Sequence, residues 1–172
     1  IYVRGVPLDF AAWEQAGAKG WSWEEVLPYY KKAEKQQVHR DDMHGTDGPL
    51  HVQDVRDKRP MDNEFIRAMN QAGIPSNPDF HGIDQAGCGY YQFTQSNGRR
   101  WSTASAYLNP IRSRTNLNIV THAHAQRVFF EGKRARGVEI RRHGKNETVR
   151  GDHIILSGGA IASPQLLSLI HI

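Results

Sequence analysis

The chain has 172 residues, of which 38% are hydrophobic and 23% are charged, so it can bury the core of a single domain or of parts of two. This globular composition excludes a disordered or fibrous protein. The net charge of +4 raises the question of an anionic partner. No window has the apolar run needed to cross a bilayer, and none resembles a signal peptide. The chain starts at Ile1, however, so we expect the natural N-terminus and its targeting information to be missing. Cys88 is the single cysteine, which excludes an internal disulfide and a thiolate cluster. We therefore expect a reducing, cytoplasmic location, with membrane association of a longer protein left open.

Two helices are expected near the N-terminus. A proline opens the first, over residues 6–13, and two glycines follow it. Ser22 and Glu25 have the spacing of a capping box, followed by apolar residues at helical spacing, which predicts a second helix. Pro28 lies inside this helix and should bend it, because proline removes a hydrogen-bond donor and crowds the preceding turn.

The next segment alternates between loops and short regular elements. Residues 36–59 are polar and rich in glycine and proline, which predicts a loop with one short strand at 50–52. Apolar residues at helical spacing predict a helix over 61–72, which ends at Gly73. Residues 75–89 are expected to form another loop.

A strand, a turn and a short helix should follow. Residues 90–95 alternate as in a strand, and the Asn-Gly pair at 97–98 is a strong turn signal. Ser102 or Thr103 should cap a short helix that Pro110 closes.

The character of the chain changes near Thr115. Residues 1–115 are expected to form a helical, loop-rich part, and residues 116–172 a strand-rich part. The strands expected in the second part span residues 117–120, 125–130, 135–142, 147–150 and 154–156.

The end of the chain has the pattern of a strand, a glycine turn and a helix. Residues 154–156 are apolar, Gly158 and Gly159 carry no side chain, and Ser163 and Pro164 fit an N-cap and a first helical position. Main-chain N–H groups at such a junction can approach a phosphate or ribose, so the pattern suits a nucleotide cofactor. The same pattern is also common in α/β proteins that bind no cofactor there.

Histidines are frequent, but their spacing does not indicate a metal site. His122 and His124 share one face of a strand and have no third ligand nearby in the sequence. His44, His51 and His81 fall in turns, with no spacing rule that would make them ligands. We expect no metal.

Three other features are ambiguous or negative. Cys88 could act as a nucleophile beside a base, but a packing role in a tight loop is favoured. Arg99, Arg100 and Trp101 could grip a phosphate or stack on a base, or the arginines could pair with carboxylates. Glu139 stands where the first glycine of a phosphate-binding P-loop would be, and the chain contains no Gly-x-Gly-x-x-Gly.

Basic residues gather between positions 127 and 150 and could bind nucleic acid or an acidic partner. They interleave with a strand pattern, however, as on the solvated faces of a hairpin. The basic residues are Arg127, Lys133, Arg134, Arg136, Arg141, Arg142, Lys145 and Arg150, and the acids among them are Glu131, Glu139 and Glu147. We keep a basic binding module as the alternative function and expect no nucleic acid.

Several blocks, in order along the chain, resemble the flavin-dependent glucose-methanol-choline (GMC) oxidoreductase family. They comprise residues 2–5, 20–30, 44–50, 97–108, 132–139 and 159–167, which begin with Tyr2-Val3-Arg4-Gly5 and end with Gly159-Ala160-Ile161-Ala162-Ser163-Pro164-Gln165-Leu166-Leu167. The last block resembles the beginning of the family's second signature.

The resemblance implies a mixed α/β (α+β) fold, with part of an FAD-binding parallel-sheet domain and part of an antiparallel-sheet substrate domain. It also implies oxidation of the CH–OH group of a primary alcohol or choline, with FAD as hydride acceptor and a separate electron acceptor in the full-length protein. Ile1 and Tyr2 fall at the end of the stretch that lies along the flavin, and Ala125 falls where the family's backbone contacts the adenine. The residues expected near the ribose and phosphates are Ser157, Gly158 and Gly159.

The resemblance also implies that this chain is an internal fragment. The family's phosphate-binding glycine turn precedes Ile1, and its catalytic histidine lies far beyond residue 172, so we expect no catalytic residue here and no activity of the fragment alone. Residues 167–172 depart from the second signature and resemble a translated sequencing-adaptor end, so we expect them not to be native.

Overall fold

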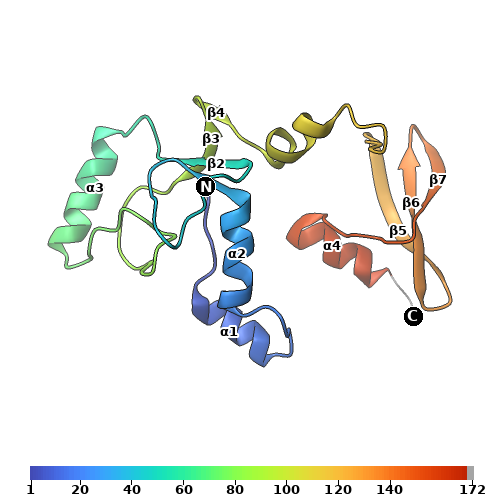
Figure 1. The fold of residues 1–172 in the computed structure, drawn as a ribbon, viewed down its shortest axis with the longest axis horizontal. Helices are drawn as coiled ribbons and strands as arrows, with labels where there is room; N and C mark the ends of the chain where they lie inside the picture. The colour runs from blue at the N-terminus through green and yellow to red at the C-terminus, as the bar shows by residue number, and fades with distance from the viewer. Residues whose placement is uncertain (170–172) are drawn as a thin grey trace. The chain divides into compact units, whose positions relative to one another are not determined.

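The computed structural model describes residues 1–169, and Ile170, His171 and Ile172 lie outside the described residues. The chain divides into two compact units, Ile1–Arg114 and a second one from Thr115 onward (Figure 1). Both contain helices and strands, which confirms the mixed α/β class.

The first unit begins with two helices, and both confirm the expectation. Helix α1 spans Pro7–Gln15, and helix α2 spans Trp23–Ala33. The capping box at the start of α2 is present: Ser22 Oγ accepts the N–H of Glu25 at 3.4 Å, and the Glu25 carboxylate accepts the N–H of Ser22 at 3.1 Å. Helix α2 continues through Pro28 without a break.

The first unit contains a four-stranded sheet, in the order β1-β2-β3-β4. Its strands are β1 (Glu34–Gln36), β2 (Leu50–Gln53), β3 (Phe93–Ser96) and β4 (Arg99–Arg100). Strands β1 and β2 are parallel, and the other two pairs are antiparallel. Asn97 (φ 51°) and Gly98 (φ 74°) form the expected turn between β3 and β4. Strand β1 was not expected, because its polar sequence has no strand pattern.

Helix α3 spans Pro60–Gln71 and confirms the expected helix, with Gly73 at φ 89° just beyond its end. After β4, a π-helical turn, η1 (Ala104–Leu108), runs into a 3-10 turn, η2 (Asn109–Ile111). Ser102 Oγ accepts the N–H of Ser105 at 3.3 Å, so Ser102 is the side chain that caps this segment.

The second unit is an antiparallel meander followed by a helix. Its strands are β5 (Ala123–Glu131), β6 (Arg134–Arg142) and β7 (Lys145–Arg150), in that order, and helix α4 (Gly159–Ser168) lies against β5 (Figure 1). Three of the expected strands are thereby confirmed.

Two expected strands are wrong. Residues 117–120 and 154–156 have no strand structure, and the side chain of Ile155 is 85% exposed. A strand needs a hydrogen-bonding neighbour, and neither segment pairs with another part of the chain between residues 1 and 169. The apolar pattern at 154–156 therefore marks an extended segment.

The expected start of the last helix is also wrong. Helix α4 begins at Gly159 with Gly158 as its N-cap, and Pro164 lies inside the helix. Ser163 does not cap the helix; its Oγ instead accepts the N–H of Gly158 at 2.9 Å, five residues back. The glycine pair thus supplies the helix start that we expected at Ser163 and Pro164.

Candidate functional site

The N-terminal segment that contains Ile1 and Tyr2 is anchored at its second residue. The Tyr2 N–H donates to the carbonyl oxygen of Gln92 at 2.8 Å, and the Tyr2 carbonyl accepts from Nε2 of His81. The Tyr2 ring lies beside the His81 ring, with centroids 4.9 Å apart. Ile1 is 72% exposed. The chain therefore holds this segment firmly at Tyr2 and leaves Ile1 at the surface.

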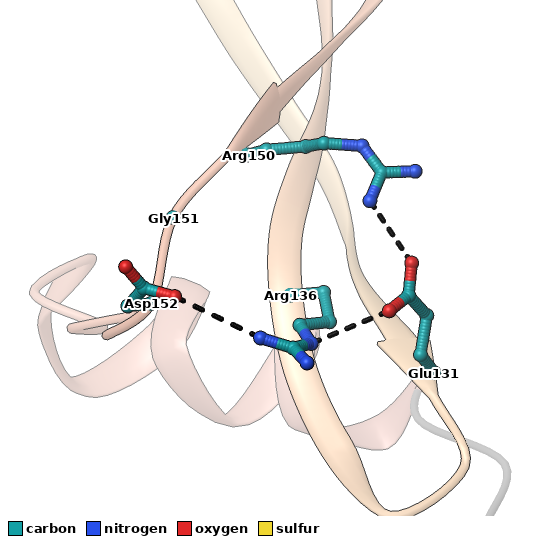
Figure 2. Close-up of a pocket in the computed structure, with 5 residues that line it drawn as sticks. All are labelled: Glu131, Arg136, Arg150, Gly151 and Asp152. Atoms are coloured by element: carbon teal, nitrogen blue, oxygen red, sulfur yellow. Dashed lines mark hydrogen bonds and ion pairs between the residues drawn. The ribbon is translucent and has the colours of Figure 1, made fainter.

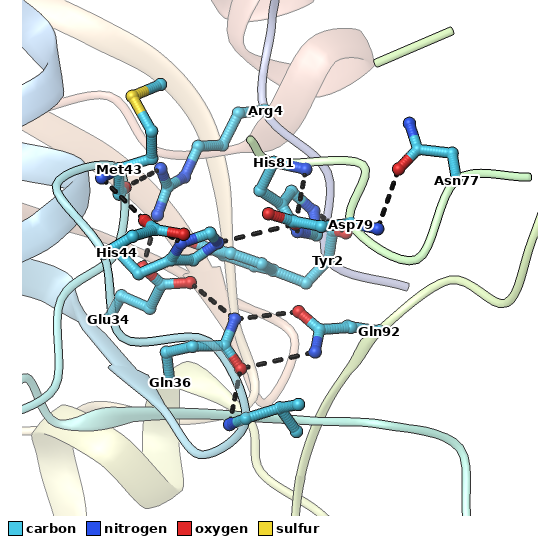
Figure 3. A network of polar contacts seen from close by, with 12 residues as sticks. Tyr2, Arg4, Glu34, Gln36, Met43, His44, Asn77, Asp79, His81 and Gln92 are labelled. Carbon is cyan, nitrogen blue, oxygen red and sulfur yellow. Dashed lines mark hydrogen bonds and ion pairs between the residues drawn. The ribbon is translucent and has the colours of Figure 1, made fainter. Parts of the chain in front are cut away.

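A buried ion pair lies two residues farther along. Arg4 pairs with Glu34 of β1, and neither side chain has exposed surface. The same carboxylate accepts the N–H of Gly45 at 2.9 Å, and Arg4 also donates to the carbonyl of Met43 at 2.6 Å. These bonds tie the N-terminal segment to β1 and to the loop before β2 (Figure 3).

Two buried glutamines complete this network (Figure 3). Gln36 Nε2 donates to Gln92 Oε1 at 2.8 Å and to Glu34 Oε1 at 3.2 Å. Gln92 Nε2 donates to Asp54 Oδ1 at 2.6 Å. Because Gln92 also accepts from Tyr2, the hydrogen bonds form a closed path through the N-terminal segment, β1 and the residues before β3.

A cluster of His44, Asp79 and His81 adjoins this network, although the three residues come from two separate loops. Asp79 Oδ1 lies 3.5 Å from Nε2 of His44 and 3.7 Å from Nδ1 of His81. On its other side, Nδ1 of His44 lies 2.7 Å from Asp41 Oδ1. Spacing rules in the sequence could not find this cluster, because only the fold brings positions 44 and 79–81 together.

The cluster shifts the pKa values of its members. Burial alone would raise the pKa of Asp79, but the neighbouring His44 and the N–H of His81 outweigh burial and lower it to about 2. Burial alone would lower the pKa of His44, but the carboxylates of Asp79 and Asp41 raise it. Burial lowers the pKa of His81. The surroundings therefore shift the two histidines in opposite directions, His44 towards its protonated form and His81 towards its neutral form.

The predicted residues of the second unit lie in β5 and at the start of α4. Ala125 is half-buried in β5 opposite Ile140, directly before a bulge at which Arg127 resumes pairing with Glu139. The hydrogen-bond ladder between β5 and β6 is therefore interrupted just after Ala125. Bulges of this kind redirect the adjacent backbone. The fold thus places Ile1 and Tyr2 in one unit and the other four predicted residues in the second.

The glycine pair at the start of α4 fits a phosphate-bearing cofactor. Residues 157–160 are exposed, and no side chain caps the N-terminus of α4, so its first-turn N–H groups are available. Gly159 has φ 82°, and a Cβ placed on it would point into open space. The main chain at Gly159 is therefore open to a ligand, whereas the N–H of Gly158 is already bonded to Ser163 Oγ. The cofactor contacts expected at Ser157, Gly158 and Gly159 stay predictions.

The basic side chains of the meander are partly paired. Arg136 and Arg150 line a pocket of about 320 Å³, and both pair with Glu131, at 3.3 and 2.9 Å. Figure 2 shows these two ion pairs. The hydrogen bond from Arg150, followed by the charges of both arginines, lowers the pKa of Glu131. Arg127 pairs in the same way with Glu139 at 2.7 Å. This pattern matches the solvated face of a meander, and nothing in the described part of the chain favours the nucleic-acid alternative.

The remaining candidates have structural contacts. Cys88 is buried, and its thiol lies 3.4 Å from Asn70 Oδ1. Trp101 donates from Nε1 to the carbonyl of Pro49 at 2.8 Å, and its ring lies 4.7 Å from that of His51. Arg99 and Arg100 are exposed. Within residues 1–169, no helix has the length and apolar character needed to cross a membrane.

Solved structures show where this fold occurs. Pyridoxine 4-oxidase from Mesorbium loti superposes with a TM-score of 0.86 at 34% sequence identity, covering 96% of this chain and 33% of that protein. An FAD-dependent oxidoreductase from Chaetomium thermophilum superposes with a TM-score of 0.79 at 23% identity, covering 88% of this chain and 29% of that one, which shows the fold alone. The fold is thus one found in oxidoreductases.

Sequence comparison defines the family. The model of the GMC oxidoreductase family matches residues 1–169, and the chain belongs to that family. An alcohol dehydrogenase [acceptor] of Pseudomonas putida is 43% identical over 173 residues, and the mitochondrial choline dehydrogenase of Mus musculus is 42% identical over 170. Each alignment covers 98% of this chain but only 31% and 28% of those proteins, so the chain spans about a third of the length of these relatives.

Proposed function

We propose that this chain is part of an FAD-dependent oxidoreductase that oxidises the CH–OH group of a primary alcohol or of choline. The observation that carries this proposal is the family match over residues 1–169 together with relatives named alcohol and choline dehydrogenases at 42–43% identity. The rival binding module finds no support beyond the net charge.

The proposed role of this chain is to position the cofactor. The exposed main chain of residues 157–159 would contact the ribose and phosphates, and the backbone at Ala125 would contact the adenine. Tyr2, anchored through Gln92 and His81, would hold the N-terminal segment along the flavin ring. Bound FAD supplies a hydride acceptor, whereas the protein supplies orientation and a base. We assign no catalytic residue to this chain.

Two matched glycine variants test the cofactor contact in the complete protein that contains this chain. Gly159 and Gly132 both have positive φ, and a Cβ at either position would meet open space, so alanine strains the backbone similarly at both. Gly159→Ala should lower the amount of FAD retained after purification, whereas Gly132→Ala, in the turn between β5 and β6, should not. Equal FAD contents in both variants would contradict the assignment of α4 to the cofactor.

The 172-residue chain offers a second comparison, because it lacks a Gly-x-Gly-x-x-Gly turn. Mixed with free FAD, it should bind weakly or not at all, as measured by equilibrium dialysis. A purified 172-residue chain that carries stoichiometric yellow flavin would contradict this prediction, because FAD would then be held without that turn.

A further inference from the structure

The cluster of His44, Asp79 and His81 has an unusual arrangement of hydrogen-bond acceptors. A carbonyl oxygen only accepts, so His81 Nε2 must carry the proton that it donates to the carbonyl of Tyr2. In the neutral ring, Nδ1 of His81 therefore presents a lone pair. This buried Nδ1 has no hydrogen-bond partner among the residues that the structure describes, and it lies 3.7 Å from Asp79 Oδ1.

The same reasoning applies to His44. Its Nδ1 lies 2.7 Å from a carboxylate oxygen of Asp41, which accepts, so Nδ1 carries a proton. Its buried Nε2 has no hydrogen-bond partner within residues 1–169 and lies 3.5 Å from Asp79 Oδ1. When the ring is neutral, two imidazole lone pairs without a donor among the described residues thus converge on a carboxylate oxygen that accepts the N–H of His81, and both histidine side chains have zero exposure.

Buried acceptors that converge in this way are destabilising unless a hydrogen-bond donor or a cation lies between them. A proton on Nε2 of His44 is one solution, since its neighbours raise the pKa of His44. With that proton, His44 could donate a hydrogen bond to Asp79, but Nδ1 of His81 would still have no donor in the described part of the chain. A metal ion would satisfy all three atoms at once.

The distances suit a divalent transition metal. Two ligands that each lie about 2.0–2.1 Å from a tetrahedral zinc ion are separated by roughly 3.3 Å. The three candidate ligand atoms lie within 4.8 Å of one another, and Asp79 Oδ1 lies 3.5 and 3.7 Å from the two nitrogens. Small side-chain adjustments would close the site.

The outer contacts also resemble those of histidine metal ligands. Such histidines usually donate their second ring N–H to a carboxylate or a backbone carbonyl, which fixes the tautomer and the ring orientation. His44 donates to the Asp41 carboxylate, and His81 donates to the carbonyl of Tyr2. Asp79 is held by the N–H of His81 at 2.9 Å and donates its own N–H to Asn77 Oδ1 at 2.8 Å.

We propose that His44 Nε2, Asp79 Oδ1 and His81 Nδ1 bind a first-row divalent cation of the zinc class. Three protein ligands leave one tetrahedral position for water. The ion would join the loop at 41–44 to the loop at 79–81 and, through His81, to the N-terminal segment at Tyr2. This structural metal site is independent of the proposed redox function.

The test uses the untagged 172-residue chain, freed of metal by a chelator and titrated with Co²⁺ and then Zn²⁺. We expect one Co²⁺ per chain, with visible absorption typical of tetrahedral coordination, and displacement by Zn²⁺. Asp79→Asn should weaken binding at least ~100-fold, and Asp41→Asn, which removes only an outer contact, about 10- to 100-fold. His124→Gln, at an exposed histidine of β5, should bind like the unaltered chain.

Circular dichroism of each variant separates loss of ligand from loss of fold. If the folded, unaltered chain takes up neither Co²⁺ nor Zn²⁺ at a concentration of about 100 µM, the proposal is wrong, because this concentration lies well above the dissociation constants of structural zinc sites. Binding that survives in folded Asp79→Asn, or that disappears in His124→Gln, would also overturn it. If Asp79→Asn does not fold, two results still test the proposal: metal uptake by the unaltered chain and the intermediate loss of metal affinity in Asp41→Asn.

Discussion

At the scale of single residues, Arg4 has the largest expected effect on stability. Arg4→Met would leave the Glu34 carboxylate buried without its cation, since neither side chain of the pair has exposed surface. Breaking a buried ion pair from one side costs about 3–5 kcal/mol of unfolding free energy. Urea denaturation should show this loss in Arg4→Met.

The exposed pair of Arg67 and Glu64 on α3 provides the control, since these side chains are 69% and 58% exposed. Arg67→Met should cost no more than about 0.5 kcal/mol. Similar losses in both arginine variants would mean that the pair between Arg4 and Glu34 does not stabilise the first unit.

Tyr2 gives a prediction about alkaline pH, because burial raises the pKa of its phenol. A raised pKa means that the stability contributed by the neutral phenol is intact below the unfolded-state pKa of about 10 and is lost as pH rises through the folded-state value. Tyr2→Phe should therefore lose less unfolding free energy than the unaltered chain across that range.

Tyr29, which is 72% exposed on α2, supplies the matched variant. Titration followed by phenolate absorbance should lose a late step in Tyr2→Phe but keep it in Tyr29→Phe. If both variants keep that step, Tyr2 ionises as freely as a surface tyrosine and the account of its burial is wrong.

At the scale of elements, Gly45 links the loop after β1 to helix α2. A Cβ on Gly45 would lie 1.8 Å from the carbonyl oxygen of Lys31, a contact that only a backbone shift can relieve. Gly45→Ala should therefore cost about 1–3 kcal/mol, as overpacking does. At Gly151 the nearest atoms would lie 3.6 Å away, so Gly151→Ala should leave the melting temperature nearly unchanged. Equal melting temperatures would contradict the close approach of the loop to α2.

Elements with local signals could be predicted from the sequence. Ser22 and Glu25 mark the start of α2 because a capping box involves only neighbouring residues, and the Asn97-Gly98 turn requires positive φ at both positions. Strand β1 could not be predicted, because its buried Glu34 has its charge partner in Arg4, thirty residues earlier. The strand predicted at residues 154–156 was wrong for the opposite reason: the sequence has a strand pattern there, but no neighbouring strand within residues 1–169 pairs with it.

In the candidate site, too, only the features with a local sequence signal could be predicted. The glycines at 158–159 could be predicted from their place before a helix, although the exact cap could not. The cluster of His44, Asp79 and His81 could not, because its geometry depends on two loops that meet only in the folded unit. All six cofactor contacts stay predictions: those of Ile1, Tyr2, Ala125, Ser157, Gly158 and Gly159.

At the scale of the whole molecule, the order of motifs carried more information than any single motif. No block alone distinguishes this chain from other α/β proteins, but their succession indicated the GMC oxidoreductase family, which the match over residues 1–169 confirms. The chain corresponds to 28–31% of the length of its alcohol and choline dehydrogenase relatives. The activity that we propose is therefore that of a longer protein that contains this chain.

The most direct measurement is the visible flavin absorbance of that complete protein under anaerobic conditions, before and after addition of choline or a series of primary alcohols. If the chain belongs to an FAD-dependent alcohol oxidoreductase, one of these compounds should bleach the flavin, with one equivalent of aldehyde formed per flavin reduced. A protein that holds FAD but is bleached by none of them would contradict the proposed substrate class, and a protein that holds no FAD would contradict the account as a whole.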